Sequence, residues 1–246
     1  MIGKTPFVLI VTIALVTATS YLFVKNQREG VVKRLHDPKR QIRYIVTTGP
    51  EKSPLKTAYL AELLQLSTDH PTPFDLFIEK DAEQELQKSP VIKHVEVSKK
   101  APDTIIVDYS IYHPIASLGD FENTAIDEEG HLFPLKPFFS PKNLPEIITG
   151  AKTYKTPLES NALALAQSLL TLLTAHNLNP TRIDTSSAFH ASLGRREIVL
   201  ILNTHTLRLF PENPEKQLGN YLSLAPTLPR HTTLDLRLEQ CAYLSD

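Results

Sequence analysis

The residues that could carry out chemistry are scattered through this sequence rather than grouped into a motif. Asp184, Ser186, Ser187 and His190 share one polar stretch and include the residue types of a nucleophile and its base. No G-x-S-x-G turn presents the serines, however, and catalytic triads are assembled in space from distant segments. Asp and Ser more commonly form turns and caps in such a stretch. An exported hydrolase is therefore kept only as the least favoured of three functional hypotheses, and the other two are given below.

Metal and cofactor sites are not expected either. The nine histidines occur singly, without a pair at helical or hairpin spacing, and Cys241 is the only cysteine. A single cysteine excludes an internal disulfide and any cysteine-rich metal site. Gly3-Lys4-Thr5 imitates the end of a phosphate-binding loop but lacks the upstream glycines. The sequence thus predicts no catalytic residue, no cofactor and no metal site.

The overall composition is that of a globular protein without a charge bias. Of the 246 residues, 41% are hydrophobic and 22% are charged, and 26 basic residues balance 27 acidic ones to a formal net charge of −1. Such a chain has no global attraction for nucleic acid. At about 100 to 200 residues per domain, the length allows one large domain or two small ones.

The hydrophobic residues are concentrated near the N-terminus. No charged residue occurs from Thr5 to Val24, and a helix of about 20 residues is about 30 Å long, the thickness of a hydrocarbon core. We therefore expect a transmembrane helix at residues 5–24 after a tail of residues 1–4. The alternative is a cleavable signal peptide with a cleavage site at residues 16–18. The apolar run continues past that site, which favours the anchor.

The segment after this helix is basic. Residues 25–40 contain six lysines and arginines and few large apolar residues, so we expect a linker next to the membrane that either contacts anionic lipid or is simply solvated. Taken alone, the positive-inside rule would place the bulk of the chain in the cytoplasm. A tail of four residues is easily translocated either way, so the rule is weak here.

The order of elements beyond residue 40 predicts an α+β protein. For residues 41–111 the sequence predicts the order strand, helix, helix, strand, strand. The length of this segment is that of a small α+β domain. The remainder is rich in strands, with hairpins at residues 122–133 and 196–210. A capping box at residues 156–159 and Asn213-Pro214 each predict the start of a helix. Leu234, Leu236 and Leu238 alternate with polar residues and predict a half-buried closing strand.

Several short stretches in this order point to a known family. The most specific are residues 89–97 (SPVIKHVEV), 101–107 (APDTIIV) and 113–116 (HPIA). Residues 42–49, 126–133, 144–150 and 234–237 (LDLR) add weaker similarities to strands and a hairpin of the same family. Together these stretches resemble the bacterial cell-division family FtsQ, called DivIB in Gram-positive bacteria, over essentially the whole chain.

The resemblance implies a single-pass protein of the cytoplasmic (inner) membrane without catalytic activity. Its cytoplasmic tail would be residues 1–4, its POTRA domain residues 41–113 and its β domain residues 114–246. Both domains would lie outside the cytoplasm, on the periplasmic side, and the protein would be a divisome scaffold enriched at the septum. The runner-up is another POTRA-containing module that binds or chaperones polypeptides in the cell envelope.

The resemblance also implies a partner and a site for it. Family members pair their C-terminal strand with FtsB of the FtsB–FtsL complex, and by position that strand runs from Leu234 to Tyr243. The three leucines would face the core, and the backbone and polar side chains would face the partner or solvent. A surface ion pair between Asp235 and Arg237 is an equally good reading of those two residues. The expected partner-binding residues are Leu234, Leu236, Arg237, Leu238, Glu239 and Tyr243, with no nucleic acid or small-molecule substrate.

Overall fold

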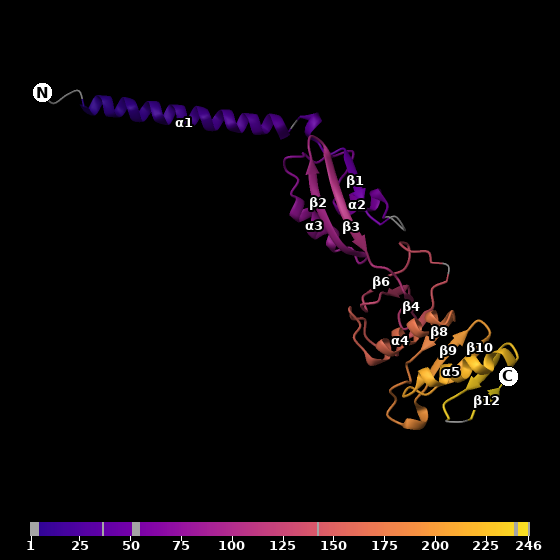
Figure 1. Ribbon diagram of the computed structural model, residues 1–246. Helices are drawn as coiled ribbons and strands as arrows, with labels where there is room; N and C mark the ends of the chain where they lie inside the picture. Colours follow the sequence, from indigo (N-terminus) through magenta and orange to yellow (C-terminus); the bar gives the residue numbers. More distant parts are fainter. Residues whose placement is uncertain (1–4, 36, 51–54, 142, 239–240, 246) are drawn as a thin grey trace. The chain divides into compact units, whose positions relative to one another are not determined.

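A computed structural model describes residues 5–35, 37–50, 55–141, 143–238 and 241–245, the side chains of residues 5–16, 18, 31 and 32 excepted. The chain divides into two compact units, residues 1–110 and residues 111–246 (Figure 1). Both combine strands and helices, and the second is dominated by a large sheet. The α+β class predicted from the sequence is therefore confirmed.

The first unit begins with a long helix, α1 (Thr5–Leu35). The helical state predicted for residues 5–24 is confirmed, and the helix continues into residues that were expected to form a linker. The continuation is reasonable because residues 25–35 contain no proline, and the next proline, Pro38, lies in the short helix η1 (Pro38–Arg40). Over the residues that the structure describes, no helix is both long enough and apolar enough to cross a membrane.

The rest of the first unit has the predicted order of elements. It contains β1 (Tyr44–Thr48), α2 (Thr57–Leu63), α3 (Glu79–Gln87), β2 (Ile92–Lys100) and β3 (Thr104–Ile111), with β3 between the other two strands and parallel to β1. Leu60 and Leu86 from the helices and Ile105 and Val107 from β3 are fully buried. The core therefore lies between the two helices and one face of the sheet. Ser53 and Pro54, a pair of residues typical of a helix start, lie outside the described residues.

The second unit is built on one extended sheet. Over the described residues it has nine strands in the order β12-β11-β10-β9-β8-β7-β4-β5-β6. β7 is parallel to both β4 and β8, β10 is parallel to β11, and β12 is antiparallel to β11. The strands are β4 (Ala116–Leu118), β5 (Thr124–Ile126), β6 (Leu132–Pro134), β7 (Glu146–Ile148), β8 (Pro180–Asp184), β9 (Ile198–Leu202), β10 (His205–Leu209), β11 (Thr232–Asp235) and β12 (Tyr243–Ser245).

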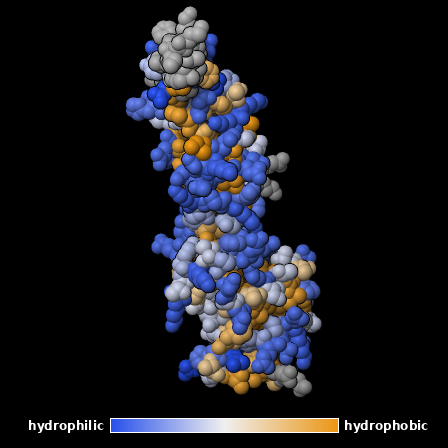
Figure 2. All heavy atoms as spheres, turned by 90° about the vertical axis from the view of Figure 1, so that its left-hand side faces the viewer, coloured by the Kyte–Doolittle hydropathy of each residue, from blue (hydrophilic) through white to orange (hydrophobic). Residues whose placement is uncertain are grey.

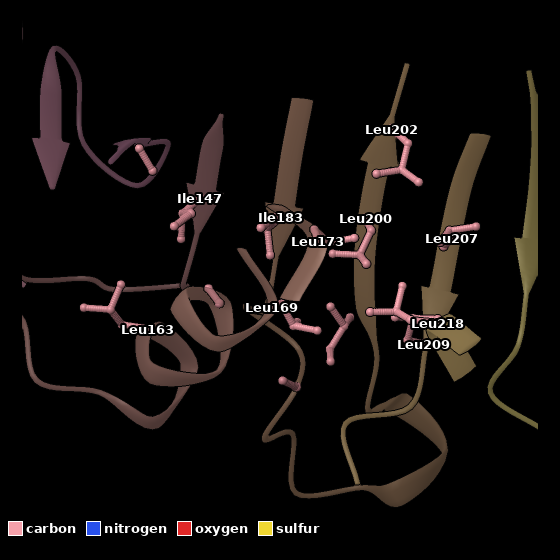
Figure 3. Close-up of a cluster of buried hydrophobic side chains, with 14 of the residues drawn as sticks. Ile147, Leu163, Leu169, Leu173, Ile183, Leu200, Leu202, Leu207, Leu209 and Leu218 are labelled. Atoms are coloured by element: carbon pink, nitrogen blue, oxygen red, sulfur yellow. The ribbon is translucent and has the colours of Figure 1, made fainter. Parts of the chain in front are cut away.

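Two longer helices pack on this sheet. In Figure 3, Leu163, Leu169 and Leu173 of α4 (Asn161–Ala175) lie among side chains from β7, β8 and β9. Leu218 of α5 (Pro214–Leu224) lies beside Leu209 of β10. These four leucines of α4 and α5 are buried in one hydrophobic cluster with the strands. The short helices η2 (Leu193–Arg195) and η3 (Ala225–Thr227) connect elements.

One local prediction for this unit was wrong. The capping box expected at residues 156–159 does not start α4, because the Thr156 hydroxyl accepts the Leu132 N–H at 3.0 Å and Ser160 caps the helix instead. Asn179-Pro180 lies beyond the end of α4, and Pro180 is the first residue of β8. A proline is tolerated at the first position of a strand, where its missing N–H costs little.

Candidate functional site: the C-terminal sheet edge

The strand expected at residues 234–243 is two strands that fold back on each other. β11 ends at Asp235, and β12 returns antiparallel beside it, so that Leu234 lies opposite Leu244 and Asp235 opposite Tyr243. The prediction of one continuous strand was therefore wrong. Glu239, one of the expected partner-binding residues, lies outside the described residues. The outer strand on this side of the sheet is β12 (Figure 1).

The three leucines that were expected to share the core face separate at the end of β11. Leu234 and Leu236 are buried, with 1% and 5% of their surfaces exposed, whereas Leu238 is 73% exposed. The prediction for Leu238 was wrong because the two-residue alternation holds only while the chain stays in the strand. Tyr243 is 72% exposed on β12, as an interface residue would be in the free protein.

In β12, one residue directs its backbone N–H and C=O groups away from the rest of the sheet. The Leu236 N–H donates to the Arg208 carbonyl of β10 at 2.9 Å, so Leu234 and Leu236 direct their peptide groups toward β10. Thr233 and Asp235, which alternate with them, face β12, and they pair with Ser245 and Tyr243. Successive residues of a strand point their peptide groups to opposite sides. The N–H and C=O of Leu244 therefore face the open edge.

Charged side chains lie on one face of the sheet beside this edge. Arg237 donates to the Asp235 carboxylate at 2.6 Å and lies 3.4 Å from Glu197, which also accepts hydrogen bonds from Arg208. Burial of the Asp235 carboxylate disfavours its charged form, but the hydrogen bonds from Arg237 outweigh this effect and lower the pKa of Asp235 below its usual value. Asp235 and Arg237 are thus paired within the protein, which agrees with the ion-pair reading.

A groove runs along the same region. It has a volume of about 710 Å³ and lies between α5 and the segment that joins β11 to β12. Leu224, Leu236, Leu238 and Cys241 are among its lining residues, and Cys241 is an exposed free cysteine. Figure 2 shows that exposed hydrophobic atoms also gather elsewhere on the second unit, in its lower part in this view. The C-terminal edge therefore combines an open backbone with apolar surface.

The opposite edge of the sheet is less suited to strand addition. It is formed by β6, which has three residues and ends in Pro134, a residue without an N–H to donate. Leu132 and Phe133 of this strand are buried. β12 is equally short, so the proline is what distinguishes this edge, and prolines on edge strands are a device by which natural sheets block edge pairing.

The residues of the hydrolase hypothesis do not form a triad. The Ser186 hydroxyl donates to the Asp184 carboxylate at 2.6 Å, and the His190 Nδ1 accepts the Ser192 N–H at 3.0 Å. Asp184 also accepts the Ser186 N–H, which makes this a local turn. The His190 N–H donates to the Ser187 carbonyl at 3.2 Å, and among the described residues no hydrogen bond joins the His190 imidazole to the hydroxyl of Ser186 or Ser187. These contacts are those of a surface loop.

The comparison with protein families identifies the first unit. Residues 41–108 match the family model described as "POTRA domain, FtsQ-type". No curated protein matches the chain. The match covers β1 to β3, the part of the chain whose strand–helix–helix–strand–strand order was predicted. A POTRA domain of this type is a non-catalytic module for protein–protein interaction, and it indicates a role in cell division. Residues 41–108 are thus a POTRA domain of the FtsQ type, in line with the resemblance of the sequence to the FtsQ/DivIB family.

Proposed function

We propose that this protein is a cell-division scaffold anchored in the cytoplasmic membrane, with both compact units on the outer side and enrichment at the division septum. In this proposal the second unit binds an FtsB/FtsL-like partner, which adds a strand to the edge of β12. The observation that carries the proposal is the FtsQ-type POTRA domain at residues 41–108. Neither a nucleic acid nor a small-molecule substrate has a role in it.

Support for the membrane anchor comes from the sequence. Residues 5–24 contain no charge and lie within α1, and a helix of 20 residues is about as long as the hydrocarbon core is thick. The basic residues between Lys25 and Arg40 would contact anionic head groups. The charge count alone favours the opposite orientation, but a tail of four residues can cross the membrane either way. In this proposal the chain takes the orientation that the resemblance to FtsQ/DivIB implies.

Support for strand addition comes from the backbone of β12. An added strand gains main-chain hydrogen bonds from an open edge and selectivity from alternate side chains. The outward N–H and C=O of Leu244 supply the hydrogen bonds. Tyr243 and Leu244 lie on opposite faces of the strand and are 72% and 48% exposed. Because β12 has only three residues, the groove beside α5 would supply further contact area.

Proline at position 244 tests this mechanism. Leu244→Pro removes the outward N–H and leaves the two residues that pair with β11 unchanged, and proline is compatible with an edge strand whose N–H faces solvent. We expect this variant to lose co-purification with an FtsB/FtsL-like partner. Leu244→Ala is the matched control, because it shortens the side chain but keeps the N–H, and we expect it to retain binding.

Two results would contradict the proposal. If Leu244→Pro binds the partner as well as the wild-type protein does, strand addition at this edge is wrong. If a fluorescent fusion of the full-length chain is distributed evenly over the envelope instead of forming rings at midcell, the division role is wrong. The same fusion separates this proposal from a general polypeptide-binding POTRA module, which would not concentrate at the septum.

A further inference from the structure

The turn between β5 and β6 brings three metal-ligating side chains together. The Asp127 Oδ2 lies 3.2 Å from the His131 Nδ1, and the Glu129 Oε2 lies 3.5 Å from the same nitrogen. All three ligand atoms lie within 4.8 Å of one another, and the part of the chain that the structure describes holds this one group of its kind. We propose that Asp127, Glu129 and His131 form a binding site for Zn²⁺.

Two of the three separations between these atoms are close to those of ligands around a tetrahedral zinc ion, and the third, between the Asp127 and Glu129 carboxylate oxygens, is at most 4.8 Å. Zinc lies about 2.0 to 2.2 Å from carboxylate oxygens and imidazole nitrogens. Two ligands of a tetrahedral ion at these distances are about 3.3 to 3.6 Å apart. The separations of 3.2 and 3.5 Å need only a small adjustment to meet this condition. A zinc ion can therefore be bound between the imidazole nitrogen and the carboxylate oxygens after a small movement of these side chains.

The first of these ligands is already held in a binding orientation. The Asp127 Oδ1 accepts the N–H groups of Glu129 at 2.9 Å and of His131 at 2.8 Å, which leaves Oδ2 directed at the imidazole. The Gln167 amide of α4 donates to the carbonyls of Asp127 and Glu128 at 3.2 and 3.1 Å. These contacts come partly from another element of the fold, and such outer contacts orient ligands before a metal binds.

The His131 imidazole packs against an aromatic ring. Its ring lies 5.1 Å, centroid to centroid, from the ring of Tyr112, which also stacks on the buried Phe133. The His131 side chain is 28% exposed, so the site is reached from solvent without opening the core. The Glu129 side chain is 58% exposed to solvent. A fourth position is therefore open to a water molecule or to a group from another molecule.

The ligand set favours zinc over the common hard cations. Ca²⁺ and Mg²⁺ take oxygen ligands almost exclusively, and an imidazole nitrogen is a poor ligand for either. One imidazole and two carboxylates suit zinc, and two negative charges neutralise a divalent ion. The site would join both ends of the β5–β6 turn, so a bound ion would strengthen this edge of the sheet. This inference does not depend on the proposed scaffold function.

Isothermal titration of the full-length protein with ZnCl₂ tests the proposal. We expect one zinc ion per chain in the wild-type protein. Glu129→Gln and His131→Ala should each bind at least about tenfold more weakly, because each removes one of three ligands. Asp127→Asn should weaken binding as well, and it keeps an oxygen that can accept the two backbone N–H groups. A titration with MgCl₂ should give no comparable binding.

Two variants separate this site from adventitious binding by other side chains. Glu159 lines a groove together with Glu129, and His176 lies exposed at the end of α4. Glu159→Gln and His176→Ala should bind zinc as the wild-type protein does. The proposal is overturned if the wild-type protein shows no binding of one zinc ion per chain. It is equally overturned if Glu129→Gln and His131→Ala bind like the wild type, or if a control variant loses binding to the same extent.

Discussion

Leu234 of β11 lies directly opposite Leu244 of β12, ten residues later in the chain. Because β12 pairs with β11, the open edge of this sheet is β12 and not β11. Leu234 and Leu236 were expected on the partner-binding strand with their side chains in the core; both are buried, and the backbone of this strand is hydrogen-bonded inside the sheet. The residue whose peptide group is available to a partner is Leu244, which the sequence did not single out.

Proline at position 236 should destabilise the protein rather than block a partner selectively. The Leu236 N–H donates to Arg208, and its side chain is 5% exposed. The lost hydrogen bond contributes about 1 kcal/mol and the lost core packing about 2 to 5 kcal/mol. We expect Leu236→Pro to lower the free energy of unfolding by more than about 3 kcal/mol in a urea titration.

Leu238→Pro is the matched control for this variant. Leu238 is 73% exposed and lies outside both strands, so the substitution should change the free energy of unfolding by less than about 1 kcal/mol. Equal destabilisation by the two prolines would mean that the strand continues past Asp235. The original prediction of one strand over residues 234–243 would then be right.

Gly49 should not tolerate a side chain. A Cβ atom at this position would lie 2.6 Å from the Tyr109 Cε1 and 2.7 Å from its hydroxyl oxygen. The ring cannot move away freely, because it is 5% exposed and its hydroxyl accepts the Leu55 N–H at 2.8 Å. We expect Gly49→Ala to destabilise the POTRA domain by about 1 to 3 kcal/mol in thermal or urea unfolding.

Gly219 provides the comparison, because a Cβ there meets no atom within 4 Å. It lies inside α5, so Gly219→Ala should stabilise that helix by about 0.5 to 1 kcal/mol. If Gly49→Ala were as stable as the wild type, the close packing of Tyr109 against this turn would be wrong.

The stability of the second unit should depend on pH through Asp235. Its pKa in the folded protein is below the usual value of about 3.9, because the Arg237 hydrogen bonds outweigh the effect of burial. The folded state therefore binds fewer protons than the unfolded state in this range, and stability rises with pH. The contribution of Asp235 is fully present above about pH 4 and is lost as the pH falls through the lower, folded-state pKa.

Unfolding experiments between pH 2 and pH 5 measure this contribution. We expect Asp235→Asn to be less stable than the wild type at neutral pH and to lose less stability as the pH falls. The exposed Glu122 serves as a control, and Glu122→Gln should follow the wild-type curve. An Asp235→Asn curve parallel to that of the wild type across this range would show that the ion pair with Arg237 does not contribute.

The sequence predicts much of the fold because its local signals agree with the final structure. Alternation in residues 91–97 and 105–111 and the glycine at position 130 correctly indicated β2, β3 and the β5–β6 turn. Gly130 has a φ of 86°, which a glycine adopts without strain. Asn213-Pro214 likewise marked the start of α5, with proline as its first residue.

Long-range pairing explains what the sequence did not predict. Leu238 continues the alternation of Leu234 and Leu236, but strand pairing ends at Asp235, and the sequence pattern does not record where a partner strand stops. The capping signal at Thr156 was misleading because its hydroxyl binds Leu132, 24 residues earlier. For the cluster of Asp127, Glu129 and His131, an available signal was their spacing of two residues within a turn, which a search for histidine pairs misses.

The orientation of Leu244 can be tested directly by amide hydrogen exchange. In the free protein, the Leu244 N–H should exchange rapidly, whereas the N–H groups of Tyr243 and Ser245 should be slower because these residues pair with β11. Addition of an FtsB/FtsL-like partner should slow exchange at Leu244. A Leu244 N–H that is protected in the free protein, or that still exchanges rapidly in the complex, would contradict strand addition at β12.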